Sequence, residues 1–105
     1  MPYADRHPIA KSAFLANGVK LSYYQWASDK PNLILLHPSS GYGLMWDRTA
    51  IYIDGAMQVF ALDQRGHGDS DRPDGSYSAE EYAEDLYLFI TQIGLGKVTI
   101  AGHSL

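Results

Sequence analysis

The residues best suited to chemistry lie at the end of the chain, where the sequence reads Gly102-His103-Ser104-Leu105. They follow a short run rich in β-branched residues, 97–101. The pattern G-x-S-x-G places its serine on a strained strand-to-helix turn that exposes the hydroxyl. The final glycine of this pattern would be the residue after Leu105. Ser104 is therefore a candidate nucleophile, and a nucleophilic serine needs supporting elements earlier in the chain.

Composition limits the classes of function that this chain can have. The 105 residues suffice for one domain at most, and 46% hydrophobic with 19% charged residues is typical of a globular protein. A net charge of −4 favours neither nucleic acid nor an anionic membrane as a partner. The sequence has no cysteine, no signal-peptide pattern and no apolar run near the roughly 20 residues of a membrane span. We expect a cytoplasmic protein.

A β-hairpin and three further strands are predicted ahead of the serine. Two strand-like runs, 11–16 and 19–26, flank Asn17-Gly18, a turn pair in which both residues adopt positive φ. This predicts an antiparallel hairpin at a sheet edge. The runs 32–37 and 56–62 are apolar without alternation, which is typical of strands buried on both faces, and 97–101 is the last strand.

Two helices are predicted between these strands. The segment 44–54 is weakly helical, with Trp46, Ala50 and Ile53 on one face. A capping box, Ser78 with Glu81, begins a stronger helix, whose apolar stripe is formed by Tyr82, Leu86, Phe89 and Ile93. Alternating strands and helices predict an α/β fold with a parallel sheet. The loops 37–43, 63–77 and 102–105 then leave the carboxyl ends of strands, where ligands bind in such sheets.

These three loops give the chain its resemblance to a known family. From about residue 14 to 105 it resembles the N-terminal half of an α/β-hydrolase-fold enzyme. The segment 35–39 looks like the oxyanion loop, 63–70 matches the turn D-x-R-G-x-G-x-S, and 102–105 matches the nucleophile elbow. The resemblance implies an antiparallel hairpin leading into a parallel sheet with flanking helices. Residues 1–105 would be the N-terminal portion of one such domain, which ends here at the elbow.

The resemblance also implies roles for single residues. Ser104 would be the nucleophile, and the backbone N–H groups of Ser39 and Leu105 would form the oxyanion hole. Pro38 stands where the family usually has glycine and has no N–H, so Ser39 is the donor on this mapping. Tyr42 and Trp46 are candidates for the substrate pocket, although core packing is an equal explanation for Trp46.

Other polar residues near the loops are assigned structural roles. Asp63, Arg65 and Asp69 would brace their turn through hydrogen bonds to the backbone and to each other. His37 would hydrogen-bond backbone groups, and His67 would face solvent. The four histidines of the chain lack the spacing of metal ligands, so no metal site is expected.

The function implied is a serine hydrolase that cleaves a carboxylic ester or lactone through an acyl-enzyme, without a cofactor. In this fold the triad acid and histidine follow the serine, so both would come from the C-terminal half of the domain, in the same or a separate chain. The 105 residues alone would be inactive. The sequence leaves open a C–C bond hydrolase or a cofactor-free perhydrolase of the same fold. It also leaves open a non-catalytic fragment or a hydrolase-like binding protein.

Overall fold

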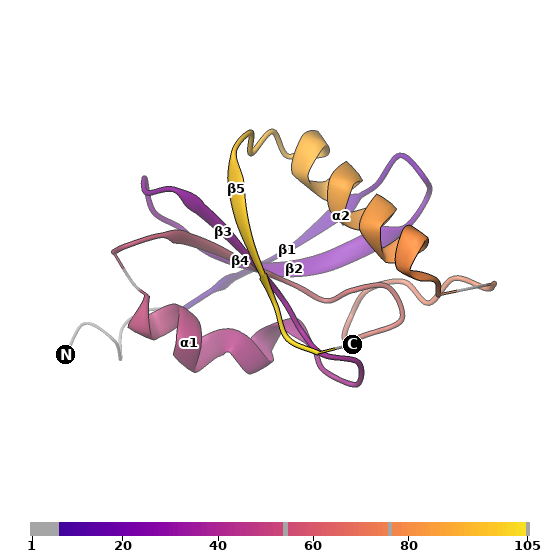
Figure 1. Cartoon of the computed structure of the whole chain (residues 1–105), viewed down its shortest axis with the longest axis horizontal. Helices are drawn as coiled ribbons and strands as arrows, with labels where there is room; N and C mark the ends of the chain where they lie inside the picture. Colours follow the sequence, from indigo (N-terminus) through magenta and orange to yellow (C-terminus); the bar gives the residue numbers. More distant parts are fainter. Residues whose placement is uncertain (1–6, 54, 76, 105) are drawn as a thin grey trace.

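Five strands form one mixed sheet (Figure 1). The structure is a computed structural model, which describes residues 7–53, 55–75 and 77–104 of the chain. The spatial order of the strands is β1-β2-β4-β3-β5. Along the chain the elements are β1 (Ile9–Phe14), β2 (Lys20–Trp26), β3 (Asn32–Leu36), the 3-10 helix η2 (Gly43–Trp46), α1 (Asp47–Tyr52), β4 (Gln58–Leu62), α2 (Ala79–Gln92) and β5 (Val98–Gly102).

The predicted hairpin and parallel strands are confirmed. The hairpin β1–β2 is antiparallel and occupies one edge, and β2 also runs antiparallel to β4. The strand β3 is parallel to both of its neighbours, with Leu36 opposite Leu62 of β4 and Gly102 of β5. The carboxyl ends of these three strands therefore lie at one end of the sheet. The three loops singled out in the sequence leave from that end, as expected.

The hairpin turn differs from the two-residue turn predicted. The amide of Gly18 donates to the carbonyl of Leu15 at 2.9 Å, and the amide of Leu15 donates to the carbonyl of Val19 at 2.8 Å. Gly18 has φ +90, whereas Asn17 is not among the residues with positive φ. The connection is therefore a three-residue loop that ends in a glycine bulge. The side-chain Oδ1 of Asn17 accepts the amide of Val19 within the hairpin at 3.2 Å, and its Nδ2 donates to residues outside the hairpin, as described below.

The inner strands β3 and β4 are covered on both faces of the sheet. On one face, Ile34, Phe60 and Leu62 pack against α2, whose Phe89 is fully buried. On the other face, Leu33, Leu35, Val59 and Ala61 pack with Trp26 and with Ala50 of α1. Residues that alternate along β3 and β4 thus enter different clusters. This is the physical reason why these strands are apolar at successive positions.

Both predicted helices are present, with one difference in form. The segment predicted as a single helix over 44–54 is a 3-10 turn, η2, followed by α1, and the final residue of that prediction lies outside the described residues. The capping box of α2 is present: Ser78 Oγ accepts from the amide of Glu81, and the Glu81 carboxylate accepts from the amide of Ser78. This satisfies two backbone donors that the first turn would otherwise leave unpaired.

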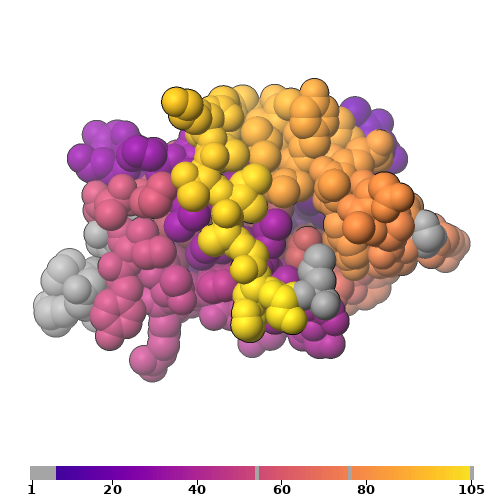
Figure 2. Space-filling view, in the orientation of Figure 1, coloured from indigo at the N-terminus to yellow at the C-terminus, as the bar shows by residue number. Residues whose placement is uncertain are grey.

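The strand β5 lies at the opposite edge of the sheet from β1 and remains largely exposed. Ile100 in its centre is 46% exposed. Figure 2 shows this strand crossing the surface of the molecule. Beyond it, the amide of His103 donates to the carbonyl of Leu36 at 3.2 Å, which continues the pairing with β3 by one residue. Within the described ranges, no helix has the length and apolar character needed to cross a membrane.

Candidate active site

Ser104 lies immediately beyond β5 in a strained backbone conformation. Its φ is +37, and Ser40 is the only other non-glycine residue with positive φ in the part of the chain that the structure describes. Left-handed backbone brings Cβ close to the following carbonyl oxygen, which costs roughly 1–2 kcal/mol. The strained turn predicted for this serine is therefore present. Strain of this kind gathers at functional sites, where the surrounding structure enforces it.

A hollow of about 310 Å³ lies beside Ser104. Its lining comes from the ends of β3 and β4 and from the terminal turn, and consists of Leu36, His37, Gln64, Gly102, His103 and Ser104. Neither Tyr42 nor Trp46 belongs to this lining. Trp46 packs against the cluster beneath α1, in agreement with the core-packing explanation. Tyr42 is 52% exposed, so its role in a substrate pocket stays a prediction.

The loop 37–43 carries the backbone donor predicted from the resemblance. The amide of Gly41 donates to the carbonyl of Pro38 at 2.8 Å, which closes a tight turn around Ser39 and Ser40. Ser40 adopts φ +77 in this turn. Among the described residues, no hydrogen-bond partner is present for the amide of Ser39. The other predicted donor, Leu105, lies outside the described residues.

Four hydrogen bonds between the turn 63–67 and the loop 37–43 hold the loop in place, one of them from Gln64 Nε2 to the carbonyl of His37 at 3.1 Å. At its start, the amide of Gln64 donates to His37 Nε2 at 3.0 Å. In its middle, the amide of Ser40 donates to His67 Nε2 at 3.3 Å. At its end, the amide of Gly43 donates to Asp63 Oδ1 at 2.6 Å. The two loops therefore form one braced unit at the carboxyl end of the sheet.

His37 is fixed in one tautomer. Its Nδ1 is 2.8 Å from the carbonyl oxygen of Pro38, which can only accept, so Nδ1 carries the proton. Its Nε2 is then the acceptor for the Gln64 amide. Burial lowers the pKa of this histidine, which is 1% exposed, and so favours the neutral ring. The expectation that His37 bonds backbone groups is confirmed, and the lone pair on its Nε2 is already in use.

His67 has the same arrangement, in contrast to the solvent-facing role expected. Its Nδ1 donates to the carbonyl of Arg65 at 3.0 Å, and its Nε2 accepts from Ser40. The ring is half-buried and lies 4.6 Å from the ring of His37, centroid to centroid. The sequence could not show this, because the contact joins two loops that are 27 residues apart.

Asp63 is a buried carboxylate that braces both loops. It is 1% exposed, and besides the Gly43 amide it accepts the amide of Asp69 on Oδ2 at 3.0 Å. The prediction of backbone hydrogen bonds is thus confirmed for Asp63. Asp69 contributes its backbone rather than its charge. A buried carboxylate needs such donors, because without them desolvation would favour its protonated form.

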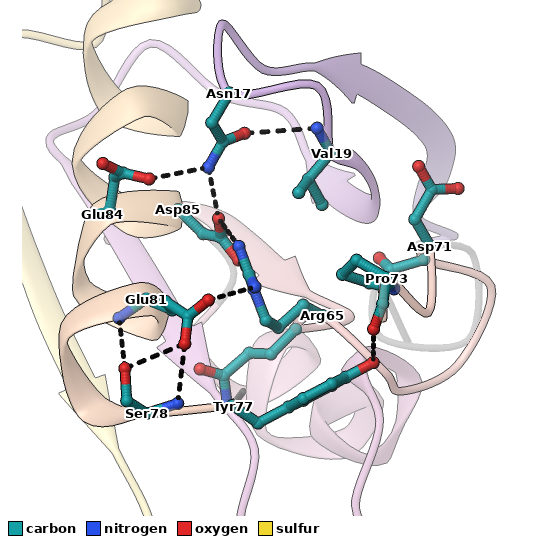
Figure 3. Close-up of polar contacts among 12 residues, drawn as sticks. Asn17, Val19, Arg65, Asp71, Pro73, Tyr77, Ser78, Glu81, Glu84 and Asp85 are labelled. Carbon is teal, nitrogen blue, oxygen red and sulfur yellow. Dashed lines mark hydrogen bonds and ion pairs between the residues drawn. The ribbon is translucent and has the colours of Figure 1, made fainter. Parts of the chain in front are cut away.

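Arg65 points away from these two aspartates and pairs with α2, which corrects the expectation that the three charges bond to each other. Its Nε and Nη2 donate to the two oxygens of Asp85 at 2.7 and 3.0 Å, and its Nη1 donates to Glu81 at 3.2 Å (Figure 3). Asn17 of the hairpin turn also donates to Asp85, at 2.9 Å. The bidentate hydrogen bond to Asp85 raises the pKa of Arg65. From the sequence, Asp85 was not identified as the partner of Arg65. An acidic residue three positions after Tyr82, on the apolar face of the helix, did indicate a buried carboxylate that needs a partner.

The described parts of the chain contain no group of three or more histidine or acidic side chains placed to hold a metal ion. The buried charged residues at this end of the sheet instead bond to backbone amides and to α2.

Comparison with known proteins gives a consistent picture. A family model described as "alpha/beta hydrolase fold" matches residues 31–105. A 2-(acetamidomethylene)succinate hydrolase of Mesorhizobium japonicum is 32% identical over 75 residues, which cover 71% of this chain and 27% of that protein. A 3-oxoadipate enol-lactonase of Acinetobacter baylyi is 27% identical over 96 residues, which cover 90% of this chain and 36% of the relative.

The fold of this chain is also similar to that of solved structures. A bacterial membrane phospholipase A has a TM-score of 0.86 and 30% identity, with 92% of this chain and 32% of that chain covered. The present chain thus spans about a quarter to a third of the length of the proteins that it matches. Its own share of such a fold consists of the hairpin, the first parallel strands and the turn at Ser104.

Proposed function

The chain belongs to the α/β-hydrolase-fold family, and on this premise we propose that it forms part of a serine hydrolase that cleaves carboxylic esters or lactones. One observation carries the proposal. Ser104 has φ +37 directly beyond β5 and lines the same hollow as the residues that anchor the loop 37–43. This is the placement that a nucleophilic serine needs beside an oxyanion loop.

The proposed reaction proceeds through an acyl-enzyme. Ser104 Oγ attacks the carbonyl carbon while its proton passes to the triad histidine, which yields a tetrahedral oxyanion. The amides of Ser39 and Leu105 donate to this oxyanion, and the loss of one such donor costs about 3 kcal/mol of barrier. Collapse breaks the ester C–O bond, and the histidine returns the proton to the leaving alcohol. Water then hydrolyses the acyl-enzyme by the same steps. No cofactor takes part.

The histidine that activates Ser104 is proposed to come from the remainder of the domain. The Nε2 lone pairs of His37 and His67 are both occupied by backbone amides, so neither is available as a base. His103 is the residue next to the nucleophile, and its amide is bound to Leu36. The family's chain order places the acid and the histidine after the serine. We expect the 105 residues alone to be inactive for this reason.

The substrate class is proposed from the hollow and from the names of the relatives. The described residues that line the hollow include no aspartate, glutamate, lysine or arginine, which suits an uncharged acyl group. One relative is named an enol-lactonase, and one similar structure is a phospholipase A. A small ester-like molecule is therefore the proposed substrate. A sequence of 105 residues without cysteine suits a reducing compartment, and we propose the cytoplasm as the location of the enzyme.

Labelling with a fluorophosphonate probe tests the proposal. The full-length protein that contains this chain is incubated with the probe, and the labelled peptide is identified by mass spectrometry. Labelling of Ser104 is expected, with complete loss in Ser104→Ala and no change in Ser28→Ala, a serine in the connection between β2 and β3. A preparation that hydrolyses a p-nitrophenyl ester yet carries no label on Ser104 would overturn the assignment.

A further inference from the structure

We propose that His67 is a positioning residue for the oxyanion loop 37–43, and that it acts through the lone pair on its Nε2. Its Nε2 accepts the amide of Ser40 and thereby fixes the turn that carries the amide of Ser39. The inference rests on the proposed function of Ser104. It adds to that function a positioning residue that lies outside the catalytic triad.

The hydrogen bonds of the ring require one protonation state. The carbonyl of Arg65 can only accept, so Nδ1, at 3.0 Å from it, must carry the proton. The amide of Ser40 can only donate, so Nε2 must present its lone pair. The neutral Nδ1–H tautomer satisfies both partners. Protonation of Nε2 would set two N–H groups against each other and remove the acceptor.

Within the part of the chain that the structure describes, the hydrogen bond from the Ser40 amide to His67 leaves the neighbouring amide of Ser39 free to act. In the run 39–41, the amide of Gly41 is bound to the carbonyl of Pro38 and the amide of Ser40 is bound to His67. The amide of Ser39 is the one in this run without a partner among the described residues, and it is therefore available for an oxyanion. Ser40 holds φ +77, a conformation that its side chain disfavours. An external hydrogen bond on this residue helps to keep the loop in that shape.

The groups that face the ring offer the Ser40 amide no second acceptor. His37, from the end of β3, lies with its ring 4.6 Å away and is itself bound as a neutral acceptor. Asp63, at the end of β4, has its two carboxylate oxygens bound to the amides of Gly43 and Asp69. The guanidinium of Arg65 is directed to Asp85 on α2. Among the described residues, His67 Nε2 is therefore the protein acceptor that holds the Ser40 amide.

Two substitutions at His67 distinguish the role of the hydrogen-bond acceptor from the packing of the ring. His67→Phe keeps a flat ring against His37 but offers no acceptor. His67→Gln can place its Oε1 near the position of Nε2, and this acceptor does not titrate. In the full-length enzyme, His67→Phe is expected to lower kcat about tenfold, the effect of one ordinary hydrogen bond. KM should stay within about twofold, because an oxyanion donor acts mainly in the transition state. His67→Gln should recover most of the kcat.

The split between kcat and KM, together with the recovery in His67→Gln, is a readout that a merely structural role would not move. Thermal unfolding of both variants accompanies the kinetics. If His67→Phe fails to fold, His67→Leu takes its place, and a wild-type kcat in that variant overturns the proposal.

The outcomes for His67 and for Ser104 can be told apart. A wild-type enzyme that shows no fluorophosphonate label on Ser104 contradicts the proposed function itself. If Ser104 is labelled and His67→Phe retains the wild-type kcat, only the positioning role of His67 is wrong. That role is equally wrong if His67→Gln is as slow as His67→Phe, since restoring the acceptor would then restore nothing.

Discussion

A Cβ atom added at Gly68 would overlap the carboxyl carbon of Asp63. The turn 66–70 wraps around this carboxylate so closely that only a residue without a side chain fits. The carboxylate is not free to move, because its oxygens accept the amides of Gly43 and Asp69. The D-x-R-G-x-G-x-S turn thus requires its second glycine for packing as well as for backbone conformation, since Gly68 also has φ +53.

Gly68→Ala is expected to destabilise the protein severely. The positive φ costs roughly 1–2 kcal/mol, and the overlap with Asp63 adds roughly 1–3 kcal/mol of overpacking. Gly96→Ala is the matched control, because Gly96 has φ +67, close to that of Gly68, and open space around its would-be Cβ. Urea unfolding of the full-length protein measures both. Equal losses in the two variants would show that packing against Asp63 is unimportant.

Asp85→Asn is expected to lower the free energy of unfolding by about 3–5 kcal/mol, because it leaves the buried Arg65 cation without its bidentate partner. Glu84→Gln, one residue earlier and exposed, alters only a contact to Asn17 and should change stability by less than about 0.5 kcal/mol. Denaturant unfolding separates the two predictions. A loss in Asp85→Asn as small as that in Glu84→Gln would mean that Glu81 alone satisfies Arg65.

Stability is expected to fall in mild acid because of His37. Its pKa is held below the ordinary value of 6.5 by burial, so the unfolded chain binds a proton near that pH and the folded chain does not. Well above pH 6.5 both states are neutral, and the free energy of unfolding is unaffected. Below it, the free energy should decrease by up to about 1.4 kcal/mol per pH unit until the lower folded-state pKa is reached.

The variant His37→Gln tests this origin of the acid sensitivity. Its side-chain oxygen can still accept the Gln64 amide, but it does not titrate. The slope of unfolding free energy against pH between about 7.5 and 5.5, the window around the histidine pKa, should flatten. It should persist in His7→Gln, which removes an exposed histidine. An identical slope in the wild type and in His37→Gln would assign the acid sensitivity to other groups.

The backbone strain at Ser104 predicts an unusual order of stability. Because its φ is +37, Ser104→Gly should be more stable than Ser104→Ala by about 1 kcal/mol. At Ser39, whose φ is not positive, the order should reverse, with the glycine variant about 0.4–1 kcal/mol less stable than the alanine variant. Thermal unfolding of the four full-length variants measures this. Ser104→Ala as stable as Ser104→Gly would argue that the turn relaxes once the hydroxyl is removed.

Elements with local signals could be predicted from the amino-acid sequence. The capping box of Ser78 and Glu81, the non-alternating runs of β3 and β4, and the turn at Ser104 all follow from neighbours in the chain. The order of these elements was also enough to predict the end of the sheet at which the loops meet. The same local signals carried the resemblance to the family.

Which polar groups meet was settled only by packing in three dimensions. Arg65 faces Asp85 rather than the aspartates of its own turn, and the two residues are 20 positions apart. His67 turns inward to Ser40, 27 positions away. The 3-10 start of the segment 44–54 is a further feature that the chain's periodicity did not predict. A buried charge or imidazole takes whichever partner the packed backbone brings within about 3 Å, and spacing along the chain does not encode that partner.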